Sequence, residues 1–192
     1  MVIRLNSVSS KDQTDNSCFA SKVRLRLDSL DFVSTPEPRV LECFGGEGLL
    51  WKEVSRISGK TIKSLRIDEK KDLPGYYLQG NNLKILPTLD LSTFDIIDLD
   101  AYGVPWDQLA ILKDLGYSGV LHITHIHFGS LPYSAIEYLG ITREMISKSP
   151  MLYHTLGITP VKAILYDMGY RKIHYYQPTV QRTYLWAKKD LP

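Results

Sequence analysis

Residues 40–48, Val-Leu-Glu-Cys-Phe-Gly-Gly-Glu-Gly, constrain the fold of this chain more than any other stretch. The apolar start predicts a buried strand, the glycines predict a turn, and Leu-Leu-Trp-Lys-Glu-Val after them begins a helix. Gly45, Gly46 and Gly48 permit positive φ angles and a close approach to a ligand, while the helix N-terminus offers free N–H groups. This strand-turn-helix predicts an α/β protein that binds a nucleotide-like ligand at the turn.

The glycine spacing separates two kinds of nucleotide ligand. The dinucleotide fingerprint requires Gly-x-Gly-x-x-Gly, but Gly-Glu-Gly at 46–48 is followed by Leu-Leu-Trp, so the third glycine is absent. Glu47 would also repel a pyrophosphate at the positive end of the helix dipole. We therefore expect a ligand without phosphate. The alternative is that the turn only joins a strand to a helix, as in any α/β protein.

Three further stretches end where parallel strands would bring them to the same edge of a sheet. Strand two, at residues 61–67, closes on Asp68 about 20 positions beyond the glycine turn, where an acidic residue can accept both ribose hydroxyls. A short third strand at residues 76–80 delivers Asn81 and Asn82, and an amide there can hydrogen-bond an adenine edge. The fourth strand, at residues 95–100, brings its own carboxylates beside the turn. For Asp68, a solvated carboxylate in a charged run is the alternative.

Glu42, Phe44, Gly46 and Gly48 match the acidic-x-Phe-x-Gly-x-Gly first motif of S-adenosylmethionine (SAM) dependent methyltransferases, in the phenylalanine form that resembles the nucleic-acid-modifying branch. The stretch at 98–105, Asp-Leu-Asp-Ala-Tyr-Gly-Val-Pro, is similar to the Asp-Leu-Asp-Pro-Phe/Tyr-Gly-Ser-Pro motif of tRNA guanine N2-dimethyltransferases. Val-Leu-His-Ile-Thr at 120–124 resembles the Leu-Leu-x-Val-Thr segment of that family.

The resemblance covers residues 38–128 and departs from the family's pattern at two positions. Ala101 replaces the motif proline, and His127 stands where the family places an acid.

The resemblance implies an α/β, Rossmann-like class I methyltransferase fold. This fold has a mostly parallel seven-stranded sheet and a C-terminal antiparallel hairpin, which we expect at residues 172–177 and 182–188 around Pro178. The implied cofactor is SAM, and the implied cofactor-binding residues are Glu42, Phe44, Gly45, Gly46, Gly48, Asp68, Asn81 and Asp98.

Asp100 and Tyr102 are the implied catalytic residues. Asp100 would accept a hydrogen bond from a base amine, and Tyr102 would stack on the base. The implied partner is a nucleic acid, RNA rather than DNA. Methylation of a small molecule or a protein side chain is the alternative, and a binding module without turnover is a third possibility.

His125 and His127 lie two apart on the expected fifth strand and so share one face, whereas His122 points to the other. We expect the pair to line the substrate cleft. A zinc site would need further ligands, and no Cys-x-x-Cys or His-x-x-x-His partner is present, so no metal is expected.

Residues 130–157 form an expected helical insertion that overhangs the cleft. They combine tyrosines with Arg143 and Lys148, and aromatic and basic side chains together are typical of single-stranded nucleic acid binding. Core tyrosines and solvated charges are the alternative. We expect both cations to contact the substrate.

The 192 residues suit a single domain, with 44% apolar and 23% charged residues. Residues 1–17 are polar and predict a flexible lead, and residues 18–35 predict an N-terminal helix. That helix is expected to pack its apolar side on the sheet, with Lys22, Arg24 and Arg26 interleaved; a nucleic-acid contact by this basic side is the alternative. Two cysteines and no apolar signal core predict a cytoplasmic protein.

Overall fold

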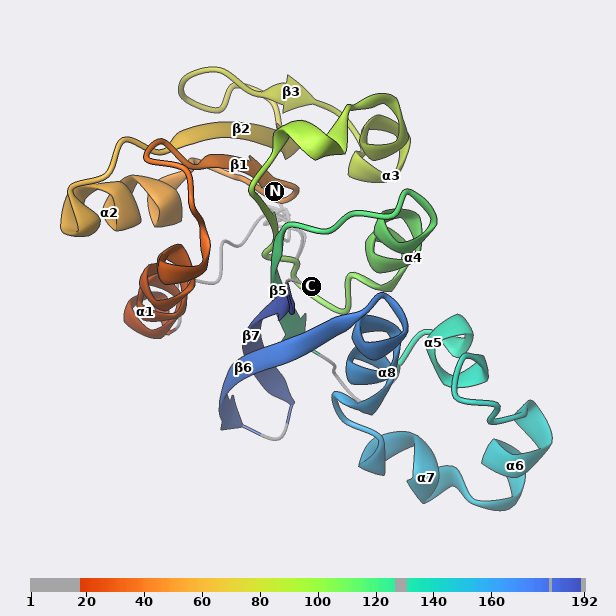
Figure 1. Ribbon diagram of the computed structural model, residues 1–192. Helices are drawn as coiled ribbons and strands as arrows, with labels where there is room; N and C mark the ends of the chain where they lie inside the picture. Colours follow the sequence, from red (N-terminus) through yellow and green to blue (C-terminus); the bar gives the residue numbers. More distant parts are fainter. Residues whose placement is uncertain (1–17, 127–130, 180, 191–192) are drawn as a thin grey trace, which may run out of the picture.

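The computed structural model describes residues 18–126, 131–179 and 181–190, and within them seven strands form one sheet in the order β3-β2-β1-β4-β5-β7-β6 (Figure 1). Strands β1 to β5 are parallel to one another, and β7 pairs antiparallel with both β5 and β6. The expected mostly parallel sheet with a C-terminal antiparallel hairpin is confirmed. The strands are β1 (Arg39–Glu42), β2 (Lys63–Asp68), β3 (Leu78–Gln79), β4 (Ile96–Leu99), β5 (Val120–Ile126), β6 (Tyr170–Thr179) and β7 (Arg182–Lys189).

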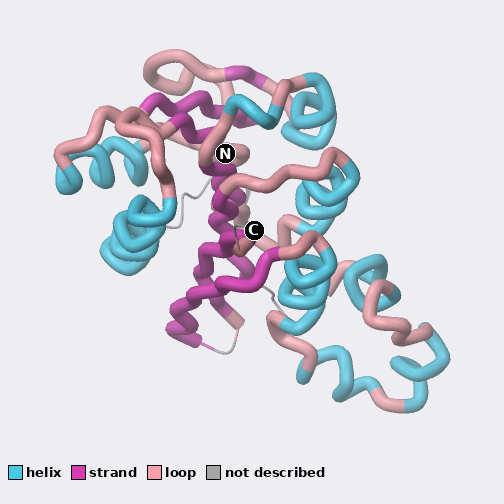
Figure 2. Tube along the Cα trace, in the orientation of Figure 1, coloured by secondary structure: helices cyan, strands magenta, loops and turns pink. Residues whose placement is uncertain are grey.

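Helices cover both faces of this sheet, as the tube in Figure 2 shows around the central strands. One face carries α1 (Phe19–Ser29) and α2 (Leu49–Ser58), and the other carries α3 (Asn82–Ile85), α4 (Trp106–Asp114) and α8 (Thr159–Asp167). Short 3₁₀ turns follow α1 at Leu30–Phe32, follow α3 at Leu86–Thr88, and precede β4 at Leu91–Thr93.

Alternation along the central strands explains this three-layer packing. In β4, Ile96 packs in the cluster beneath α1 and α2, and Ile97 packs in the cluster beneath α3, α4 and α8. Side chains two apart share a face, so Asp98 projects toward α1 and α2, as Glu42 does in β1. The two carboxylates are partners across the β1–β4 pair. Polar groups thus lie on the face that α1 covers, near the carboxyl ends of the strands.

Helix α1 corrects the expected distribution of charge around the N-terminal helix. Lys22 and Arg26 are buried along with Val23 and Leu25, whereas Arg24 points to solvent. The sequence predicts Lys22, Arg24 and Arg26 on a basic side next to the apolar face. Two of them lie in it because carboxylates on the sheet face them from β4 and its end.

The C-terminal hairpin differs from the expectation at its turn. Pro178 lies inside β6 rather than at the bend, and the β6–β7 register shifts between Tyr176 and Thr179. Such a shift accommodates a proline, which cannot donate to a strand ladder.

The insertion expected at 130–157 contains three short helices, α5 (Tyr133–Glu137), α6 (Arg143–Lys148) and α7 (Pro150–Thr155). They extend beyond α8, on the side of the sheet away from α1 and α2 (Figure 1). The expected flexible lead at 1–17 lies outside the described residues. In the described part of the chain, every helix is too short or too polar to cross a membrane.

Candidate functional site

The glycine turn joins β1 to α2 by a left-handed bend. Gly46 has φ of 45° and Gly48 has φ of 70°, a region that side chains other than glycine rarely adopt. Helix α2 begins directly after Gly48, so Glu47 belongs to the turn and not to the helix. The strand-turn-helix therefore has the geometry that its sequence predicts.

Arg66, from β2, lies directly under this turn. A Cβ atom on Gly45 would lie 2.7 Å from both Cβ and Cγ of Arg66, closer than such atoms can approach. The guanidinium donates to the carbonyl oxygen of Gly46 at 2.6 Å and to that of Tyr76 at 3.3 Å, and also to that of Pro74. One buried arginine thus joins the turn to the β2–β3 loop.

Asp68 ends β2 beside the same turn. Its Oδ2 accepts the backbone N–H of Gly46 at 2.8 Å, and its Oδ1 accepts that of Lys70 at 2.9 Å. A carboxylate has about four acceptor sites, so each oxygen keeps a free one. The backbone therefore fixes Asp68 in place and leaves it able to accept two hydroxyl groups of a ligand.

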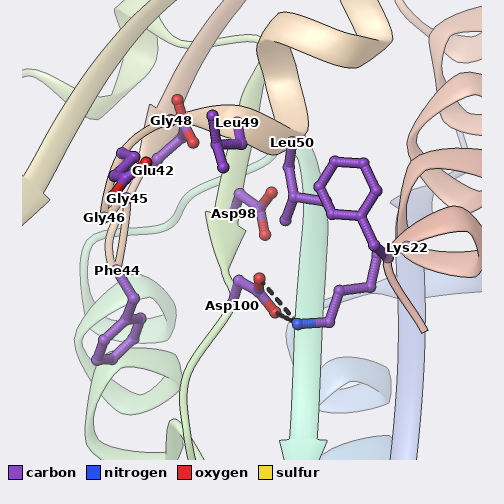
Figure 3. A pocket seen from close by; sticks show the side chains of 12 residues that line it. Lys22, Glu42, Phe44, Gly45, Gly46, Gly48, Leu49, Leu50, Asp98 and Asp100 are labelled. Atoms are coloured by element: carbon purple, nitrogen blue, oxygen red, sulfur yellow. Dashed lines mark hydrogen bonds and ion pairs between the residues drawn. The ribbon is translucent and has the colours of Figure 1, made fainter. Parts of the chain in front are cut away.

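A pocket opens between the glycine turn, the end of β4 and the start of α1 (Figure 3). In this view the glycines lie on one side, Lys22 lies on the other, and Asp98 and Asp100 lie between them. The lining residues are Phe19, Lys22, Glu42, Phe44, Gly45, Gly46, Glu47, Gly48, Leu49, Leu50, Asp98 and Asp100. Six of the eight expected cofactor residues therefore line one pocket, and only Asp68 and Asn81 are not among its lining residues.

Glu42 presents one unsatisfied carboxylate oxygen to this pocket. It is only 5% exposed, and its Oε1 has no hydrogen-bond partner among the described residues. Burial and, to a lesser extent, the neighbouring Asp98 carboxylate raise the pKa of its carboxyl to about 8. A buried acceptor without a donor costs free energy, so this oxygen suits a ligand that brings an N–H or O–H donor.

Asp98 is held by protein groups. Arg26 donates to both of its oxygens, from Nε at 2.7 Å and from Nη2 at 2.8 Å, and the indole N–H of Trp51 donates at 2.7 Å. Asp98 is 2% exposed. It therefore fixes α1 and α2 against the sheet while also lining the pocket.

His122, on β5, is buried near Arg26, and its Nε2 lies 2.8 Å from the hydroxyl of Ser29. Burial lowers the pKa of this histidine well below its ordinary value, and the nearby Arg26 lowers it further.

Asp100 lies one pleat farther along, beyond the end of β4. The ammonium Nζ of Lys22 lies 2.9 Å from Oδ1 and 3.1 Å from Oδ2, and the hydroxyl of Thr124 donates to Oδ1. The ammonium also lies 5.2 Å from the ring centroid of Tyr184. The side chains of Lys22 and Asp100 are 7% and 18% exposed, so the pair faces the pocket from a largely buried position.

Other expected site residues lie outside this pocket. Tyr102 is 58% exposed on the loop after β4. Asn81 caps α3, accepting the N–H of Leu83 at 2.9 Å, and donates to Glu69 at 2.7 Å. The side chain of its neighbour Asn82 is buried and donates to the carbonyl oxygen of Cys43.

The expected substrate residues are also dispersed. His125 is 1% exposed in β5, on the face opposite His122, and His127 lies outside the described residues. Arg143 lies over the ring of Tyr133 at 4.5 Å, and Lys148 pairs with Glu144 at 2.6 Å. Both cations thus have partners inside the insertion, and neither lines the pocket.

Sequence reasoning did not assign Lys22, Arg26, Arg66 or Thr124 to the site. Lys22 and Arg26 are four apart and therefore share one helix face. Two cations at this spacing on an otherwise apolar helix face indicate that carboxylates face that side of the helix. No sequence signal marked Arg66, and Thr124 belongs to the segment that resembles Leu-Leu-x-Val-Thr but was given no role there.

Comparison with known proteins gives similarity in structure only. No protein-family model and no curated protein matches the chain. A SAM-dependent methyltransferase from Archaeoglobus fulgidus superposes with a TM-score of 0.54 at 18% identity, over 90% of this chain and 95% of the other. The plantazolicin methyltransferase BamL, solved with S-adenosylhomocysteine (SAH), gives 0.54 at 15% identity, over 93% and 86%.

Human N-acetylserotonin methyltransferase, solved with SAM, gives a TM-score of 0.51 at 15% identity, over 92% of this chain and 54% of the other. Since all three identities are low, the likeness concerns the fold. The chain has the Rossmann-like α/β fold seen in these methyltransferases.

Proposed function

We propose that the chain is a SAM-dependent methyltransferase whose cofactor binds over the glycine turn. The observation that carries this proposal is the buried, unpartnered Oε1 of Glu42 in a pocket bounded by that turn. SAM brings an ammonium group, whose N–H donors suit this oxygen. The similarity of the fold to solved methyltransferases supports the same assignment.

The described residues fit the rest of this cofactor. The free acceptor sites on Asp68 suit the two ribose hydroxyls, and the glycines let the ligand lie close to the backbone. When bound, the cofactor supplies a methyl group that its sulfonium makes reactive. The chain then has to hold the acceptor in line with that methyl, a positioning effect worth roughly 7 to 11 kcal/mol. Asp100, at the end of β4, is the candidate positioning group.

Titration calorimetry tests the proposal. We expect SAM and SAH to bind and NAD not to bind. Asp68→Ala should weaken SAM binding by at least about tenfold, because each hydrogen bond to a charged acceptor contributes about 1.5 to 3 kcal/mol. Asp114→Ala, which removes an exposed carboxylate at the end of α4, is the control and should leave the affinity unchanged. Tight NAD binding, or equal SAM affinity in the Asp68 variant, would overturn the assignment.

A base amine of RNA or DNA is one candidate acceptor. Tyr102, 58% exposed two residues after Asp100, is available to stack on a base. A small molecule is the other candidate, supported by the partners that Arg143 and Lys148 already have within the insertion. Incubation with labelled SAM and separate pools of tRNA, rRNA, DNA and small amines distinguishes the two acceptor classes. Absence of labelling in every pool, with SAM still bound, would indicate a binding module.

A further inference from the structure

The ion pair between Lys22 and Asp100 lies on the side of the pocket away from the glycine turn (Figure 3). If the turn and Glu42 hold the cofactor, this side is left for the methyl acceptor, so the inference below rests on the proposed function. Both side chains line the pocket although both are largely buried. The pair is thus built into the fold and still accessible to a ligand.

Lys22 and Asp100 do not use all of their hydrogen-bond donors and acceptor sites within the protein. Oδ1 of Asp100 accepts from Thr124 and lies within ion-pair distance of Lys22, which accounts for its two acceptor sites. Oδ2 accepts from Lys22 and keeps one site. The ammonium has three N–H donors and only Asp100 as a hydrogen-bond partner in the described residues, so at least one donor remains. One donor and one acceptor therefore lie side by side.

We infer that Lys22 and Asp100 together select a neutral methyl acceptor that carries an N–H donor next to a hydrogen-bond acceptor atom, as in the edge of an amide. The N–H would donate to Oδ2 of Asp100, and the adjacent acceptor atom would receive the free N–H of Lys22. Lys22 is then a specificity-determining residue contributed by α1.

Charge supports this choice over the two obvious alternatives. A cationic amine that approaches Asp100 also meets the ammonium of Lys22, and a carboxylate that approaches Lys22 meets Asp100. Like charges brought together in a desolvated site cost several kcal/mol, and proteins use such repulsion to exclude the wrong partner. A neutral edge meets neither repulsion and satisfies both remaining groups.

Three probes with the same ring test the inference: benzamide, which is neutral, benzylamine, which is a cation, and benzoate, which is an anion. Each is titrated by proton NMR into the protein saturated with SAH at pH 7.5. We expect benzamide to bind about tenfold or more tightly than the other two, in keeping with the cost of like-charge contact. Equal binding of the three probes, or binding of none at millimolar concentration, would overturn the inference.

Variants of the pair give a sharper test, because each should change the preferred charge. Lys22→Met leaves Asp100 without its cation, so benzylamine should become the preferred probe. Asp100→Asn leaves Lys22 without its anion, so benzoate should become preferred. An unchanged order of the three probes in both variants would contradict a selective role.

Two controls separate selectivity from folding. Arg24→Met removes a cation from the exposed side of the same helix and should leave the order unchanged. The double variant Lys22→Met/Asp100→Asn removes both charges and so relieves any unpaired buried charge. Urea denaturation checks that this variant is folded, and the folded variant should lose the preference for benzamide; a retained preference would overturn the inference. Failure of SAH to bind the wild type would instead refute the proposed function, and titrating the free protein would still test the pair.

Discussion

Glu42 links ligand binding to pH at the scale of one residue. Its pKa is about 8 in the folded protein, against about 4.5 for an ordinary glutamate, because burial and Asp98 disfavour the charged form. The folded state therefore binds this proton more tightly than the unfolded chain does. The resulting stability is fully present below pH 4.5 and is lost as pH rises toward 8.

Glu42→Gln should remove this dependence. Between pH 5.5 and 8 we expect the free energy of unfolding of the variant to rise relative to that of the wild type, as measured by urea denaturation at each pH. Glu53→Gln, which changes an exposed glutamate on α2, serves as the control. A constant difference between the Gln variant and the wild type across this range would show that Glu42 titrates normally.

Cofactor binding should respond to the same proton in the opposite direction. An ammonium donor favours the ionised carboxylate, so SAM affinity of the wild type should fall by up to about tenfold per pH unit between pH 7.5 and 6. Glu42→Gln should bind SAM more weakly at pH 7.5 and lose most of this slope. Calorimetry at pH 6, 6.75 and 7.5 measures both effects, and an equal slope in the two proteins would exclude Glu42 as the ammonium ligand.

At the scale of elements, α1 is attached to the sheet by charge as much as by apolar packing. Arg26 reaches Asp98, and Lys22 reaches Asp100, across 72 and 78 positions of sequence. Breaking a buried ion pair by removing one partner leaves the other uncompensated. The attachment of this helix is therefore sensitive to single substitutions that keep its apolar residues intact.

Arg26→Met should lower the free energy of unfolding by about 3 to 5 kcal/mol, the usual cost of leaving a buried charge unpaired. Arg24→Met, on the exposed side of the same helix, should change it by less than about 0.5 kcal/mol. Urea denaturation measures both. If Arg26→Met/Asp98→Asn is no more stable than Arg26→Met, the ion pair does not account for the loss.

The same helix shows where sequence reasoning ends. Hydrophobic spacing located it correctly, and the glycine turn followed from local patterns, whereas the mostly parallel sheet with its C-terminal hairpin was implied by the family resemblance. The burial of Lys22 and Arg26 did not follow, because it depends on carboxylates that only the folded sheet brings near. Spacing within one helix cannot show which distant residues face it.

At the scale of the whole molecule, the pocket and the insertion of α5 to α7 lie on different sides of the sheet. The pocket is bounded by α1, α2 and the end of β4, whereas α5 packs against α8. The sequence places the insertion correctly in the chain, but the position of a long connection relative to a cleft depends on tertiary packing. Its contribution to substrate choice stays a proposal.

Arg143→Ala/Lys148→Ala tests that contribution. SAM affinity should be unchanged, because neither residue lines the pocket. If the acceptor is single-stranded RNA or DNA and both cations contact phosphate, the slope of log affinity against log salt should become shallower by about 1.4. Fluorescence anisotropy with a labelled oligonucleotide at several salt concentrations measures this slope. An unchanged slope would show that these side chains contact no phosphate.

The close approach of Arg66 restricts which residues position 45 can hold. The approach of 2.7 Å that forbids a Cβ at position 45 comes from the arginine below the turn and not from any ligand above it. Shortening the residue at 66 does not remove this contact, because it includes the Cβ of Arg66, which every residue type except glycine carries. Among descendants of this chain, a glycine kept at 45 would therefore record the close approach of β2 to the turn rather than selection for ligand binding.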